Sequence, residues 1–124
     1  MSRKHTTVYP SAARTATPTA VTVPVGRYNA LHLVIDVTAI TATPSVVCTV
    51  DGYDPVSGKY YNLLTSAALT ESGVPYTRVL KIGRGLTAAA NLTANDVLPS
   101  TIRVTMTHGD ADSITYSVAA TLVD

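Results

Sequence analysis

The 124 residues, with a mass of 13.0 kDa, are enough for one domain and too few for a second hydrophobic core. Only 14% of the residues are charged, against about 25% in an ordinary soluble domain, while threonine occurs 20 times; the charge pairs that stabilise solvated helices are missing, which excludes an all-helical chain. The net charge of +1 argues against nucleic acid as the main partner, since neutralising a phosphate backbone needs many lysines and arginines on one face.

The N-terminal segment differs from the rest of the chain. Residues 1–19 contain two prolines and no hydrophobic periodicity, which predicts an extended arm outside the folded domain. Residues 1–35 carry four basic and no acidic residues, a charge of +4, whereas residues 36–124 carry five basic and eight acidic residues, a charge of −3. We expect the arm to lie on an acidic neighbour, with a disordered solubilising tail as the alternative, and the candidate contact residues are Arg3, Lys4, Arg14 and Arg27.

From residue 20 onward, short segments alternate between apolar and polar residues and are separated by turn sequences. In the clearest of them Leu31, Leu33, Ile35 and Val37 share one face, which is the two-residue period of a half-buried strand. The same reasoning predicts strands over residues 20–25, 28–37, 45–53, 60–64, 74–82, 101–107 and 114–122.

The connections between these segments carry turn chemistry. Residues 54–59 include Pro55 and Gly58 and predict a hairpin turn, whereas residues 86–99 predict a long connection. The sequence therefore predicts an all-β protein: a single β-sandwich of seven or eight antiparallel strands, Greek-key or jelly-roll-like, over residues 20–124, with the arm at 1–19.

Two further classes are excluded by local composition. The longest uncharged stretch, residues 37–50, has 14 residues and contains Pro44, whereas a membrane-spanning helix needs about twenty apolar residues. The basic N-terminus leads into Thr and Pro rather than into an apolar core, so it lacks the central region of a secretory signal. We expect synthesis in the cytoplasm and no membrane partner.

The residues that could carry chemistry form no known catalytic or nucleotide-binding motif. Gly83-Arg84-Gly85 follows no strand-to-helix pattern and is expected to be a turn. His5, His32 and His108 lie far apart in the sequence, without a second ligand at metal spacing. We therefore expect no enzyme activity, no metal and no cofactor, and a hydrolase that uses His32 or His108 is a remote alternative.

Two aspartate pairs and one cysteine complete the list of candidates. The pairs Asp51/Asp54 and Asp110/Asp112 could supply oxygen ligands to Ca²⁺, but aspartate also caps the backbone of turns, which is the simpler interpretation. Cys48 is the only cysteine, so it forms no disulfide within the chain, and its position on an inward face predicts a buried thiol that packs as a small hydrophobe.

Tyrosines are concentrated in the middle of the chain. Tyr60 and Tyr61 are neighbours in a predicted strand and therefore point to opposite faces, so at least one of them faces outward. A tyrosine ring can pack in the core, contact a protein partner or stack on a sugar. We include Tyr60 and Tyr61 among the candidate partner-binding residues.

Four stretches of the chain resemble small structural proteins encoded among the head and tail genes of tailed bacteriophages, particularly those of actinobacterial hosts. They are LHLVIDVTAI at 31–40, DGYDPVSGKYY at 51–61, LTAAANLTANDVLP at 86–99 and THGDADSITYSV at 107–118. The resemblance implies a virion structural protein of the capsid decoration type, a β-sandwich that sits on the shell, stabilises the head and often trimerises. It transfers no functional residue.

The expected function is therefore binding to the outside of a phage capsid by protein–protein contacts, with the major capsid protein as partner and the capsid surface as location. In this interpretation residues 1–27 run across the capsid protein or a sister subunit. The alternative is a β-sandwich module at the tail tip or connector, which contacts a host glycan or a tail protein.

Overall fold

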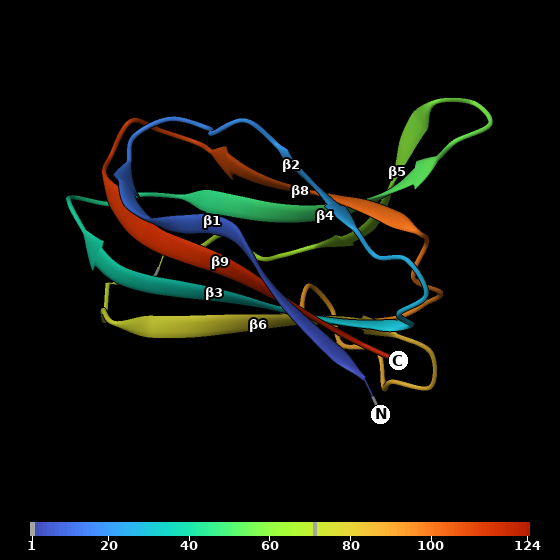
Figure 1. Ribbon diagram of the computed structural model, residues 1–124. Coiled ribbons are helices and arrows are strands. Elements are labelled where there is room, and N and C mark those ends of the chain that lie inside the picture. The colour runs from blue at the N-terminus through green and yellow to red at the C-terminus, as the bar shows by residue number, and fades with distance from the viewer. Residues whose placement is uncertain (1, 71) are drawn as a thin grey trace.

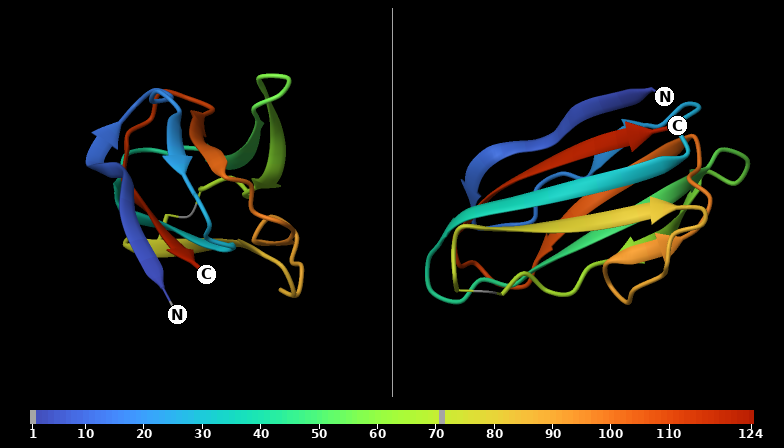
Figure 2. Two further views of the ribbon diagram at one scale, coloured as in Figure 1. Left: turned by 45° about the vertical axis from the view of Figure 1, so that its right-hand side comes forward. Right: turned by 90° about the horizontal axis from the view of Figure 1, so that it is seen from below.

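The computed structural model describes residues 2–70 and 72–124, and these form nine strands and no helix. The strands are β1 Arg3–Arg14, β2 Val21–Pro24, β3 Ala30–Ile40, β4 Val46–Asp54, β5 Lys59–Thr65, β6 Tyr76–Gly83, β7 Thr93–Asn95, β8 Thr101–His108 and β9 Ile114–Val123. They build a five-stranded sheet of order β1-β9-β3-β6-β7 and a four-stranded sheet of order β2-β8-β4-β5. Figure 1 and Figure 2 show the two sheets as facing layers.

The predicted all-β sandwich is confirmed, with nine strands in place of the expected seven or eight. All pairings in the described ranges are antiparallel except that of β6 with the three-residue strand β7, which is parallel. Strand β7 falls within the connection predicted over residues 86–99. It was missed because three paired residues inside a Thr-, Ala- and Asn-rich loop produce no periodic signal.

The prediction that residues 1–19 form an arm outside the domain is corrected by β1. This strand is the edge of the five-stranded sheet, and it pairs with β9 from Arg3↔Val123 to Arg14↔Ile114. It has no alternating pattern because only Val8 and Tyr9 are buried and the pairing register shifts on both sides of Tyr9. Pro10 is compatible with this position, since an edge strand has one unpaired side.

The core lies between the sheets and contains the apolar residues predicted to face inward, together with residues that were not, among them Val8 and Tyr9 of β1 and Leu69 and Leu98 of the loops. On β3 and β9 alternate side chains are buried, and those of β4 and β8 meet them from the other sheet. Cys48 is fully buried among them, as predicted, and burial raises the pKa of its thiol to about 12. The fully buried side chains on these four strands include Leu31, Leu33, Ile35, Val37, Val46, Cys48, Val50, Ile102, Val104, Met106, Ile114, Tyr116, Val118 and Leu122.

The chain ends and the β4–β5 hairpin determine where the candidate surfaces described below lie. The chain ends lie side by side, and the Asp124 amide donates to the Ser2 carbonyl at 3.3 Å (Figure 1). The β4–β5 hairpin extends beyond the rest of the sandwich (Figure 2). Its predicted turn is confirmed: Gly58 adopts a φ of 74°, and the Asp54 carboxylate accepts hydrogen bonds from the Ser57 hydroxyl and the Val56 amide, which lower its pKa. Over the described ranges, no helix of membrane-spanning length and hydropathy occurs.

Candidate functional site

The sequence named six candidate partner-binding residues, and the structure distributes them over three places. One group lies where β1 begins, one arginine lies where β1 ends, and the two tyrosines lie on the β4–β5 hairpin. The residues are Arg3, Lys4 and Arg27 in the first place, Arg14 in the second, and Tyr60 and Tyr61 in the third.

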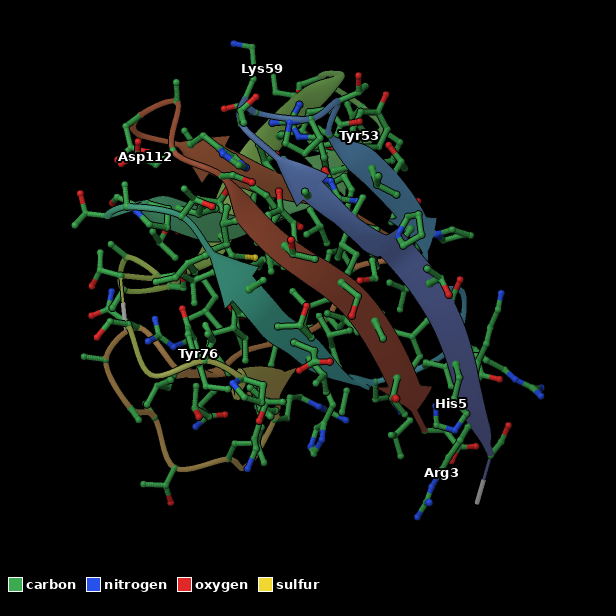
Figure 3. All side chains as sticks on the ribbon, turned by 90° about the vertical axis from the view of Figure 1, so that its left-hand side faces the viewer. Arg3, His5, Tyr53, Lys59, Tyr76 and Asp112 are labelled. Carbon is green, nitrogen blue, oxygen red and sulfur yellow. The ribbon has the colours of Figure 1, made fainter. Side chains whose placement is uncertain are left out.

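The first place is a cluster of basic side chains that we call the basic end of the five-stranded sheet. It forms because β1 and β3 begin where β6 and β9 finish, so residues from distant parts of the chain meet. All of its members are exposed. Figure 3 shows two of them, Arg3 and His5, at the end of β1 that lies away from Asp112. The basic end consists of Arg3, Lys4, His5, Arg27, His32, Lys81 and Arg84.

Part of the basic end is a row across four strands. The register pairs His5 with Thr121, Thr121 with His32, and His32 with Lys81, so these four side chains share the outer face of the sheet. His5 Nδ1 lies 2.9 Å from the Thr121 hydroxyl, which fixes the first ring against β9.

Few acidic side chains accompany these bases. Asp124 and Asp96 lie at this end, and both accept backbone hydrogen bonds: Asp124 Oδ1 from the Ser2 amide at 2.9 Å, and Asp96 Oδ1 from the Val97 amide at 2.7 Å. Five basic residues and two acids give this end a charge of +3 with neutral histidines, so the remainder of the +1 chain carries −2.

At the opposite end of β1, Arg14 is bound by its own chain. Its guanidinium donates to the carbonyls of Pro10 at 2.6 Å, Tyr116 at 2.8 Å and Ala12 at 3.2 Å. The guanidinium carbon also lies 4.5 Å from the centre of the Tyr116 ring and 5.5 Å from that of Tyr9. These contacts stabilise the bulged part of β1, so the structure gives Arg14 an intramolecular role and does not group it with Arg3, Lys4 and Arg27.

The Arg14 contacts belong to a group of side chains that joins the two sheets. We call this group the closed cluster, and it consists of Tyr9, Arg14, His108 and Tyr116. The Tyr9 hydroxyl donates to the carbonyls of Thr19 and Val104, at 2.8 and 3.1 Å, and thereby ties β1 to the segment leading into β2 and to β8. His108 Nε2 lies 3.0 Å from the Tyr116 hydroxyl, and the Thr17 hydroxyl accepts from the His108 amide at 2.9 Å.

Burial controls the protonation of this cluster. Desolvation raises the pKa of Tyr116 to about 12, and the positive charge of Arg14 opposes that shift only partly. Desolvation and then Arg14 lower the pKa of His108. The His108 Nδ1 atom is buried and has no hydrogen-bond partner among residues 2–70 and 72–124. A neutral imidazole and a protonated phenol are therefore the favoured pair.

The third place is the β4–β5 hairpin. Its Tyr60 belongs to a polar cluster on the outer face of the four-stranded sheet. The Arg103 guanidinium carbon lies 3.7 Å from the centre of the Tyr60 ring, and the Tyr53 ring centre is 5.0 Å from it at an angle of 49°. Asp51 joins the neighbouring strands, since it forms a 3.2 Å ion pair with Arg103 and accepts from Asn62 Nδ2 at 3.3 Å. Because Arg103 covers one face of Tyr60, the ring is held in place and 37% exposed.

Tyr61 lies on the other side of the same hairpin. It pairs with Gly52, and a Cβ atom placed on Gly52 would lie 2.6 Å from Tyr61 Cζ, so the ring crosses the glycine directly. The ring is 46% exposed. The two tyrosines point to opposite faces, as predicted, and both are partly accessible.

Threonines cover most of the remaining outer surface of the four-stranded sheet. Thr65, Thr49 and Thr105 pair in one row across β5, β4 and β8, and Thr22 pairs with Arg103. A hydroxyl group loses less on desolvation than a charged group, so such a face can be covered by another protein at low cost.

The remaining candidates take part in local contacts. Asp112 accepts from the Thr43 amide and Asp110 from the Asp112 amide, which is the turn-capping arrangement. His5, His32 and His108 lie on different strands, and in the described residues no three His, Cys, Asp or Glu side chains gather as a metal site would require. Gly85 has a φ of 80° in the turn after β6. No pocket opens between the described residues.

Several members of these surfaces were not singled out as partner-binding residues in the sequence. Lys81, Arg84 and His32 join the basic end only through strand order, and Arg103 reaches Tyr60 only because β8 lies beside β4. A local signal existed for Tyr53 and Tyr60, because they flank a hairpin turn and such residues pair across it. No protein-family model, no curated protein and no solved structure matches this chain.

Proposed function

We propose that this protein is a non-enzymatic structural component of a tailed-phage virion, which binds the outside of the capsid by protein–protein contacts and stabilises the shell. The four stretches that resemble phage head and tail proteins support this proposal. All four contribute exposed residues: 31–40 lies in β3, 51–61 contains the turn of the β4–β5 hairpin, 86–99 is largely an exposed loop, and 107–118 contains the turn between β8 and β9.

The observation that carries the proposal is the threonine-covered outer face of the four-stranded sheet. Its row of Thr65, Thr49 and Thr105 lies beside the row of Asn62, Asp51 and Arg103, and Arg103 belongs to the ordered cluster with Tyr60 and Tyr53. Aromatic and arginine side chains anchor protein interfaces, and the surrounding hydroxyls are readily desolvated. In the proposed arrangement this face lies on the major capsid protein, and three copies assemble around a symmetry axis, where avidity multiplies a modest contact.

Electron microscopy of the particle tests the proposal. Purified full-length protein is added to particles that lack it, and its copies are located and counted. Hundreds of copies on the shell support the proposal, whereas a dozen or fewer at the connector or tip overturn it. Tyr60→Ala removes the anchor and is expected to lower shell occupancy, while Val56→Ala, a change at the exposed tip of the same hairpin, serves as the matched control.

The same tyrosines favour one second candidate function, a glycan-binding module at the tail tip. An exposed tyrosine beside a carboxylate, an amide and a guanidinium resembles the groups that sugars need, since the ring packs on C–H groups and the polar groups bond hydroxyls. Titration with host cell-wall polysaccharide separates the candidates. Saturable binding that Tyr60→Ala abolishes would favour the glycan module over the capsid protein.

A further inference from the structure

We infer that the basic end of the five-stranded sheet is a docking surface for an acidic, extended segment of a protein partner. This inference goes beyond the proposed function, because it concerns a different surface and would hold for a partner inside or outside a virion. It starts from the distribution of charge. Five of the nine lysines and arginines lie at this end, although they come from residues 3–4, 27 and 81–84.

This grouping of like charges opposes folding. Its five lysines and arginines repel one another at this end of the sheet, whereas His32, the direct cross-strand neighbour of Lys81, adds no charge when it is neutral. Among the described residues the two carboxylates at this end, Asp96 and Asp124, each accept one backbone hydrogen bond, and their charges offset only two of the five bases. Such a concentration of exposed bases in a chain with so few charges is typical of a functional surface, where a partner supplies further negative charge.

The shape of the surface suits an extended chain. Neighbouring strands are about 4.8 Å apart, so the row from His5 through Thr121 and His32 to Lys81 spans about 14 Å. On the outer face the row is bordered by the pair Ala119 and Val34 on one side and by the pair Ala30 and Val123 on the other, which are small or medium-sized apolar residues. A peptide lying along this row could place alternate carboxylates against the bases and a backbone group against the Thr121 hydroxyl.

Charge complementarity favours a polypeptide over a nucleic acid. Duplex DNA carries one negative charge per about 1.7 Å, and its binding proteins neutralise many phosphates along a long basic face. The basic end carries only +3, which is too little charge to neutralise a long run of phosphates. A short acidic segment with a few carboxylates matches both the extent and the magnitude of this charge.

A fluorescence-anisotropy titration of the full-length protein tests the inference. The probe is a labelled eight-residue peptide that alternates glutamate and serine, and the peptide with glutamine in place of glutamate is its control. Lys81→Glu is expected to weaken binding about tenfold, whereas Lys59→Glu, the same change at an exposed strand lysine of the other sheet, leaves it within about twofold.

Several results would overturn the inference. They are an absence of saturable binding at low ionic strength, equal binding of the glutamine peptide, and equal weakening by the Lys81 and Lys59 variants. Tighter binding of an eight-nucleotide single-stranded DNA, lost in the Lys81→Glu variant, would assign the surface to nucleic acid instead. Because the titration uses no capsid, its result is separate from that of the particle experiment.

Discussion

The two ends of β1 use the same residue types for opposite purposes. At its C-terminal end, Arg14 donates to three carbonyls of its own chain and stacks on Tyr116, so its charge holds a bulged edge strand against the sandwich. At its N-terminal end, Arg3 and Lys4 lie in an exposed group with bases from other strands. The difference shows that a basic N-terminal segment is not one functional unit, because the strand it forms places one end over aromatic rings and the other in solvent.

The largest expected effect is at the ring that supports Arg14. Tyr116→Ala removes a fully buried aromatic side chain and is expected to destabilise the protein by about 3–5 kcal/mol, because it leaves a cavity and takes away the surface on which Arg14 stacks. Urea denaturation measures the loss. A change below about 1 kcal/mol would mean that the closed cluster does not depend on this ring.

The next prediction compares the stability lost when Arg14 or Arg27 is replaced by alanine. Arg14→Ala is expected to cost about 2 kcal/mol, since it removes charge-assisted hydrogen bonds to three carbonyls and the contact with the Tyr116 ring. Arg27→Ala, at the basic end, is expected to change the free energy of unfolding by no more than about 0.5 kcal/mol. Equal losses in the two variants would remove the distinction between the bound Arg14 and the exposed bases of the basic end.

A smaller effect is expected from pH. The folded pKa of His108 lies below its ordinary value of 6.5, so the unfolded chain binds more protons between these two values. The free energy of unfolding should therefore be highest above pH 6.5 and fall as the pH drops below it, with a slope of at most about 1.4 kcal/mol per pH unit from this one group. Urea denaturation at several pH values measures the slope.

The variant for the pH experiment is His108→Asn. Removing the histidine of the closed cluster should flatten the curve below pH 6.5, because the group whose pKa is lowered on folding is then absent. Parallel curves for wild type and His108→Asn would show that other groups cause the dependence.

The smallest effect has the opposite sign. Lys81→Glu replaces one base in the basic end by an acid and should stabilise the protein slightly at low salt, by up to about 0.5 kcal/mol, because it lowers the net positive charge of this end and adds an acid near the four remaining bases. Thermal unfolding at low and at high salt measures this difference, which salt should reduce. A clear loss of stability would show that Lys81 supports the fold and that its cluster is not kept for a partner.

The strands with one buried face could be predicted from local pattern. In β3 and β9 the alternating apolar residues coincide with the buried positions, because a half-buried strand must repeat every two residues. Strand β1 could not be predicted in this way, since its stability comes from backbone pairing with β9, more than one hundred residues away, and from contacts of Tyr9 and Arg14. Pairing at an edge needs no side-chain periodicity.

The contacts in the candidate surfaces also differ in whether the local sequence could predict them. The partners of Tyr60 across the hairpin could be expected from the turn at 54–59, whereas its contact with Arg103 depends on β8 lying next to β4. The basic end likewise combines Arg3 and Lys4, which composition singled out, with Lys81 and Arg84, which it did not.

By itself, therefore, the sequence determined the all-β class, most strands, the inward faces, the buried Cys48 and the hairpin turn, all of which follow from short-range periodicity and turn chemistry. Only the tertiary structure decided that residues 3–14 belong to the sandwich, that Arg14 is bound by carbonyls and aromatic rings of its own chain, and that bases from three strands and their adjoining turns meet at one end. The physical reason is that strand order and register are set by the packing of the whole core, and they bring together charges whose separation along the chain carries no information about their separation in space.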